Sequence, residues 1–150
     1  MNDVNLDSVQ FRDEKRPLRS LWVGRELGHY EIMCLLSLVR RGYEVGLYRY
    51  QPIKNLPSEI KQLDANEVIE RSKVFPTASS PGSFSGFSNV FRYRMLQVEQ
   101  SIWVDADVVA GPKGFGEASF LFGYESRQSI NGAVLSAPKN SELLQALLAE

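Results

Sequence analysis

Residues 101–109, Ser-Ile-Trp-Val-Asp-Ala-Asp-Val-Val, contain the most informative pattern in this chain. An apolar run leads into Asp105 and Asp107, and a second apolar pair follows. Apolar runs bounded in this way predict a buried strand, and in open α/β sheets ligands bind beyond the carboxyl ends of such strands. Side chains two positions apart on a strand point the same way, roughly 6–7 Å apart. We therefore expect both carboxylates to lie together at one edge of a sheet.

Two carboxylates held together at the edge of a core repel each other and lose hydration. One of them must then bind a proton, or a cation must lie between them. Oxygen ligands with no histidine or cysteine nearby suit a hard cation, so we expect Mg²⁺ or Mn²⁺ bound by Asp105 and Asp107. Such a cation most often serves a diphosphate. The first hypothesis is therefore a metal-dependent enzyme that uses a nucleotide-activated substrate.

The composition is typical of one globular domain, and with the features below it leads us to expect a cytoplasmic protein, with a membrane-associated partner left open. The chain has 150 residues, of which 43% are apolar and 23% charged, and its net charge is −1. No sustained basic stretch is present, which argues against nucleic acid as a partner. No apolar run approaches ~20 residues, so we expect no transmembrane segment. The single cysteine, Cys34, lies among apolar residues and is expected to be a buried, inert thiol.

Strands and helices are expected to alternate along most of the chain, after a flexible N-terminal arm over residues 1–17. The apolar patterns predict strands over 20–23, 43–50, 101–109, 119–124 and 132–135, and helices over 30–41, 64–71, 87–99 and 141–149. Residues 77–86 read as a flexible loop that is either a cover for a ligand or a plain surface loop. This alternation predicts an α/β domain over 18–150, with a mostly parallel sheet and helices on both faces.

Several segments, taken in order, resemble one enzyme family. These segments are Leu-Trp-Val-Gly at 21–24, Leu-Tyr-Arg-Tyr at 47–50, Gly-Phe-Ser-Asn-Val-Phe-Arg-Tyr at 86–93, Trp-Val-Asp-Ala-Asp at 103–107 and Ile-Asn-Gly-Ala-Val at 130–134. The set resembles glycosyltransferases with a short DxD sugar-binding region. That group includes capsular-polysaccharide sugar transferases, α-1,4-galactosyltransferases and, more distantly, the glucosylating bacterial toxins. The resemblance covers residues 20–150.

The resemblance implies a nucleotide-sugar-binding fold of the GT-A type. It also implies metal-dependent transfer of a sugar, usually with retention, from a donor such as a UDP-sugar to a saccharide acceptor. By position, Asp107 would bind the metal and Asp105 the metal or the ribose, and these two with Arg92 form the expected catalytic set. Trp22 would stack on the base, unless it is a core residue. The expected donor-binding residues are Trp22, Val23, Gly24, Ser88, Asn89, Arg92, Asp105, Ala106 and Asn131.

Departures from the family pattern keep other hypotheses open. Asn89 stands where many relatives have aspartate, and Gln100-Ser101 replaces a common Gly-Gly pair. Relatives usually continue past the position of Glu150, so the resemblance leads us to expect either a fragment or a shortened protein. Arg92 has an alternative role as the ion-pair partner of Asp105 or of a surface carboxylate. The alternative functions are a non-catalytic nucleotide-sugar-binding or assembly module and, less favoured, a phosphatase of the haloacid-dehalogenase kind.

Overall fold

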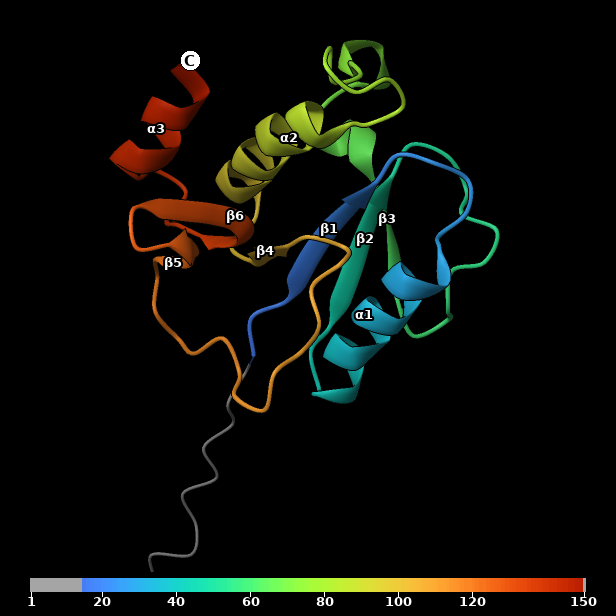
Figure 1. Cartoon of the computed structure of the whole chain (residues 1–150), viewed down its shortest axis with the longest axis horizontal. Coiled ribbons are helices and arrows are strands. Elements are labelled where there is room, and N and C mark those ends of the chain that lie inside the picture. Colours follow the sequence, from blue (N-terminus) through green and yellow to red (C-terminus); the bar gives the residue numbers. More distant parts are fainter. Residues whose placement is uncertain (1–14, 150) are drawn as a thin grey trace, which may run out of the picture.

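Six strands form one mixed sheet in the computed structural model, which describes residues 15–149 (Figure 1). The strand order is β3-β2-β1-β4-β6-β5. The strands are β1 (Leu18–Trp22), β2 (Val45–Arg49), β3 (Lys61–Asp64), β4 (Ile102–Val104), β5 (Leu121–Ser126) and β6 (Ser129–Ser136). The helices are α1 (His29–Arg40), α2 (Ser85–Val98) and α3 (Glu142–Ala149), with short 3₁₀ turns η2 (Ala65–Glu67) and η3 (Arg71–Lys73).

The sheet has a parallel part and an antiparallel part. β3, β2, β1 and β4 pair in parallel, whereas β6 pairs antiparallel with β4 and β5 pairs antiparallel with β6. The α1 and α2 connections join the parallel strands, because parallel neighbours need a crossover rather than a hairpin. The predicted α/β class is therefore confirmed, and the sheet itself is mixed.

Helices lie on both faces of the sheet, as predicted. Alternate residues of β1, β2 and β4 face opposite sides. One core contains Leu18, Leu47 and Val104 together with Leu35 and Leu38 of α1. The other core contains the intervening sheet residues Leu21, Tyr48 and Trp103, packed with Phe87, Phe91 and Met95 of α2 and with Leu144 of α3. Cys34 is buried on α1, and burial raises the pKa of its thiol, as expected for an inert cysteine.

The aspartate-bearing strand is shorter than predicted. β4 ends at Val104, and Asp105 to Val109 form a turn and loop instead of continuing the strand over 101–109. The backbone N–H of Val108 donates to the carbonyl of Asp105 at 3.1 Å, which closes the turn. The prediction that both carboxylates lie on one face of a strand is therefore wrong.

Two other segments differ from the sequence-based expectations. Residues 61–64 form β3, in which Lys61, Gln62 and Asp64 are polar and exposed; the sequence analysis placed 61–63 in no element and began a helix at Asp64. The helix expected over 64–71 is replaced by η2 and η3, although the carboxylate of Asp64 does cap η2 by accepting from the backbone N–H of Asn66. The arm predicted over residues 1–17 lies almost entirely outside the described residues.

No helix within residues 15–149 combines the length and the apolar character that crossing a bilayer requires.

Candidate functional site

The site lies where the order of the parallel strands reverses. From β1 the chain passes through α1 to β2 on one side, and it later returns through α2 to β4 on the other side of β1. Because α1 and α2 cover opposite faces, a crevice forms beyond the carboxyl ends of β1 and β4. Ligands of open α/β sheets bind at such a switch point. A cavity of about 370 Å³ opens there.

The lining of this cavity comes from four segments that are distant in the sequence. Trp22 ends β1, Glu31 lies in the first turn of α1, Ser88 and Arg92 belong to α2, and the turn after β4 supplies its side chains Asp105, Ala106 and Asp107. A second cavity of about 290 Å³ shares Trp22 and Ser88 with the first and adds Val23. We call the 370 Å³ cavity the aspartate cavity.

Asp105 is held by protein partners on three sides. Its carboxylate accepts a hydrogen bond from Nε1 of the buried Trp103 at 2.7 Å and pairs with Nη2 of Arg92 at 3.2 Å. Its backbone N–H donates to the carbonyl of Ala133 on β6 at 2.8 Å. The first aspartate of the motif is thus fixed to β4, α2 and β6 at once.

Asp107 is in a different environment, although it lines the same cavity. Its side chain is exposed, and no ion pair joins it to any of residues 15–149. Because β4 ends before Asp105, the turn carries Asp107 away from the sheet. The two carboxylates therefore differ in the property that matters for a cation: Asp107 has both oxygens open, whereas Oδ1 of Asp105 is already bonded to Trp103 and Arg92.

Arg92 is buried and bonded within the protein. Its guanidinium donates to the carbonyls of Ser88 and Gly132, pairs with Asp105, and lies over the ring of Trp103 at 5.1 Å. Burial lowers the pKa of Arg92 from its ordinary value, and the charge of Asp105 opposes that shift. The alternative stated above, an ion pair with Asp105, is what the structure contains. Arg92 thus reaches the cavity wall already paired.

Trp22 stands between the two cavities. Its Nε1 donates to the carbonyl of Glu26 at 2.8 Å, which fixes the ring over the turn that follows β1. A Cβ on Gly24 would lie 2.9 Å from that nitrogen, so the turn needs glycine to let the indole approach. Gly24 therefore supports the ring and does not itself line the aspartate cavity. The half-buried Trp22 presents an aromatic wall to both cavities.

The remaining predicted donor-binding residues divide into two groups. Val23, Ser88 and Ala106 line one or both cavities. Asn89 is exposed on α2 and lines neither cavity. Asn131 is exposed on β6, where its Oδ1 accepts from the backbone N–H of Ala133 at 2.6 Å. Asn131 thus shapes the strand that contacts Arg92 and Asp105, without lining the cavity itself.

Sequence reasoning missed four polar residues that line the aspartate cavity: Ser20, Glu31, Ser83 and Ser85. Ser83 and Ser85 lie at the end of the loop over 77–86, which places that loop beside the cavity. Glu31 brings a third carboxylate, and its first-turn position on α1 was a visible signal. Ser20 is fully buried, and its hydroxyl has no hydrogen-bond partner among residues 15–149. A buried hydroxyl without a hydrogen-bond partner cannot be predicted from the sequence.

The donor set fits a hard cation that shares its coordination with a ligand. Within residues 15–149, no three His, Cys, Asp or Glu side chains gather closely enough to enclose a metal ion by themselves. Mg²⁺ is usually bound through one or two carboxylates plus phosphate oxygens of the substrate, rather than by a full protein cage. The open carboxylate of Asp107, with Glu31 lining the same cavity, matches that pattern.

No model of a known protein family matches this chain, and no curated protein matches its sequence.

Proposed function

We propose that the protein is a metal-dependent glycosyltransferase of the GT-A type. It would transfer a sugar from a nucleotide-sugar donor, a UDP-sugar, to a saccharide acceptor, with retention of configuration. The observation that carries this proposal is the meeting of Trp22, Ser88, Asp105 and Asp107 around one cavity at the switch point of the sheet. These residues come from three separate segments of the ordered resemblance, and the fold brings them to the same edge.

Each part of the cavity has a chemistry that suits a nucleotide diphosphate sugar. Trp22 offers a flat apolar wall for a base, and base–aromatic stacking contributes about 1–3 kcal/mol elsewhere. Asp107 would hold Mn²⁺ or Mg²⁺, which supplies charge neutralisation for a leaving diphosphate. Ser88 offers a hydroxyl at the point where the two cavities meet. Arg92 would act through Asp105, by fixing the turn that presents Asp107.

A second candidate is a nucleotide-sugar-binding module of the same fold without transferase activity. Two observations favour it. Asn89 lies outside both cavities, and the guanidinium of Arg92 is already bonded to the protein. The residues that the resemblance assigns to the donor sugar are thus less available than those assigned to the base and the diphosphate. Tight UDP binding without hydrolysis or transfer of the donor would select this candidate.

Calorimetric titration with UDP tests the proposal. Binding is expected in the presence of Mn²⁺ and is expected to weaken strongly in EDTA. Asp107→Ala should abolish the Mn²⁺-dependent part of the affinity while leaving the melting temperature nearly unchanged, because the side chain is exposed. Glu125→Ala, which removes an exposed carboxylate of β5, is the matched control and should bind as the native protein does. UDP binding that is indifferent to EDTA would refute the metal-dependent proposal.

A further inference from the structure

A separate polar cavity lies near the amino-terminal ends of the parallel strands, at the end of the sheet opposite the aspartate cavity. It has a volume of about 320 Å³, and the charged side chains that line it are Lys15, Arg40, Arg41 and Lys113. No carboxylate lines it. These four cations come from three segments of a chain whose net charge is −1, so the folded structure concentrates positive charge that the sequence spreads out. We call this space the basic cavity.

The positive charge of the basic cavity is not neutralised within residues 15–149. The ion pairs of this part of the chain involve Arg19, Lys54 and Arg92, and none involves a cation of the basic cavity. Lys15 is partly satisfied, because its ammonium donates to the carbonyl of Arg41 and lies 4.8 Å from the centre of the Tyr43 ring. Arg40, Arg41 and Lys113 therefore line the cavity and have no ion-pair partner in the part of the chain that the structure describes.

The loop that carries Lys113 is anchored on both sides of it. The backbone N–H of Ala110 donates to the hydroxyl of Ser37 at 2.8 Å, and that of Phe115 donates to the hydroxyl of Tyr43 at 3.0 Å. A Cβ at Gly114 would lie 2.7 Å from the same tyrosine oxygen, so the close approach depends on glycine. Lys113 is thus held over the end of α1 by a built loop.

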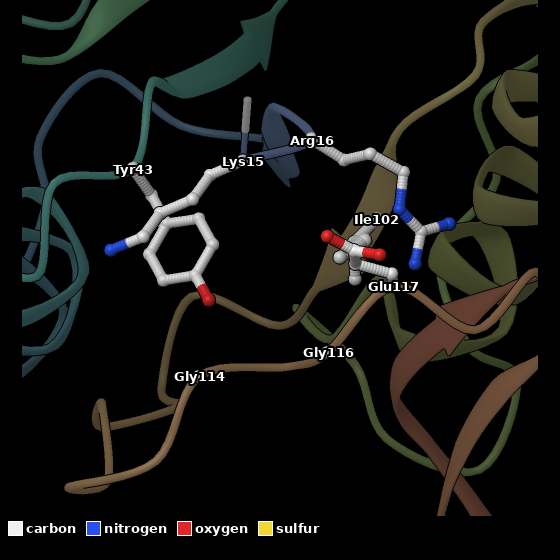
Figure 2. Close-up of a pocket in the computed structure, with 7 residues that line it drawn as sticks. All are labelled: Lys15, Arg16, Tyr43, Ile102, Gly114, Gly116 and Glu117. Carbon is white, nitrogen blue, oxygen red and sulfur yellow. The ribbon is translucent and has the colours of Figure 1, made fainter. Parts of the chain in front are cut away.

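A larger cavity of about 660 Å³ adjoins the basic cavity and shares Lys15, Tyr43 and Gly114 with it. Figure 2 shows Arg16 and Glu117 together on one side of this space and Lys15 and Tyr43 on the other. Both volumes fall within the range of small-molecule sites, about 300–1,000 Å³. A concave site of this size suits a small molecule better than it suits a nucleic acid duplex or the flat surface of a partner protein.

We propose that the basic cavity binds a small anion that carries a phosphate group. Arginine guanidinium groups match phosphate oxygens with paired hydrogen bonds, and lysine adds a point charge. The larger cavity beside it would take the remainder of such a molecule. The site is separate from the aspartate cavity, because its lining residues Lys15, Arg41 and Tyr43 lie just before β1 and β2 begin, whereas the aspartate cavity lies where β1 and β4 end. The inference therefore does not depend on the proposed transferase function.

Titration of the ¹⁵N-labelled full chain with inorganic pyrophosphate, in low salt and EDTA, tests this inference. EDTA removes the metal-dependent contribution of the aspartate cavity. Saturable amide shifts are expected at residues 110–116 and at the end of α1, with affinity that falls as NaCl is added. Shifts that do not saturate, or that leave residues 110–116 unmoved, would overturn the inference.

Charge-reversal variants make the test specific. Arg41→Glu and Lys113→Glu should each weaken pyrophosphate binding about tenfold or more, which corresponds to loss of one charge-assisted hydrogen bond. The neutral variant Lys113→Gln adds no repulsion and should weaken binding about threefold or more. Lys73→Glu, at an exposed cation on η3, is the matched control and should leave the affinity unchanged. Native affinity in the Arg41 and Lys113 variants would refute the site.

Discussion

Replacement of Arg92 by methionine tests whether this residue stabilises the structure around the site or contacts a ligand directly. In the structure the guanidinium joins α2 to β4 and β6 through Asp105 and Gly132, and its side chain is 7% exposed. Methionine keeps most of the apolar volume and removes every polar contact. The variant leaves Asp105 without its cation and leaves the carbonyl of Gly132 without its donor.

The expected loss of stability follows from these contacts. Removing one partner of a buried ion pair costs about 3–5 kcal/mol. The side chain of Asp105 is 31% exposed, so solvent screens part of that loss. The cation–π contact with Trp103 adds about 0.5–2 kcal/mol. We expect a total of about 3 kcal/mol, which for a domain of this size lowers the melting temperature by about 6–12 °C.

Urea unfolding followed by tryptophan fluorescence measures the effect, and the midpoint should fall while the slope stays unchanged. Arg94→Met is the matched control, because Arg94 is exposed on the same helix and should lose less than about 0.5 kcal/mol. A double-mutant cycle with Asp105→Asn should give a coupling energy between about 0.5 and 3 kcal/mol. If Arg92→Met were as stable as Arg94→Met but failed to bind UDP, the structural role of Arg92 would be refuted and Arg92 would be a ligand contact.

Two further predictions concern stability. Ser20→Ala should raise the free energy of unfolding in urea by about 1 kcal/mol, because it removes a buried hydroxyl without a partner in residues 15–149; a clear loss of stability would show that the hydroxyl is bonded. The pKa of Asp64 is lowered because its carboxylate accepts hydrogen bonds from the backbone and side chain of Asn66. That stabilisation is present above the ordinary aspartate pKa of about 3.9 and disappears as the pH falls through the lower folded value. Asp64→Asn should therefore lose less stability than the native protein between pH 5 and pH 3, and an identical loss would contradict the assignment.

The sequence predicts the central part of the fold because its signals there are local and agree with one another. Apolar residues recur at helical spacing from Ile32 to Val39, and Gly42 follows the end of α1 with a φ of +82°. The strands β1 and β4 were each recognisable, although the end of β4 was placed too late, and the resemblance placed Trp22 at the same site as the aspartates. Parallel pairing of the two strands then brings these residues to one cavity.

The errors arise where tertiary contacts override local pattern. Val108 and Val109 suggested that the strand continues, yet the bonds of Asp105 to Trp103 and Arg92 begin a turn at that point. β3 was missed because an exposed edge strand needs no apolar alternation. The role of Arg92 depends on Gly132, which is 40 residues away along the chain. Spacing within one helix cannot reveal such a partner.

The different environments of Asp105 and Asp107 determine how a cation would bind. A metal ion ligated by Oδ1 of Asp105 would compete with the guanidinium of Arg92, which is buried and has no second carboxylate partner within residues 15–149, whereas Oδ2 is unbonded in that range. Leaving that guanidinium unpaired would cost several kcal/mol, and this cost would weaken metal binding by the same amount. Asp107 carries no such penalty, because its carboxylate is exposed and free of ion pairs in the same range. We therefore expect Asp105 to act as the anchored residue and Asp107 as the open carboxylate, so that substitution of Asp105 should destabilise the fold, whereas substitution of Asp107 should weaken metal-dependent binding and leave the fold intact.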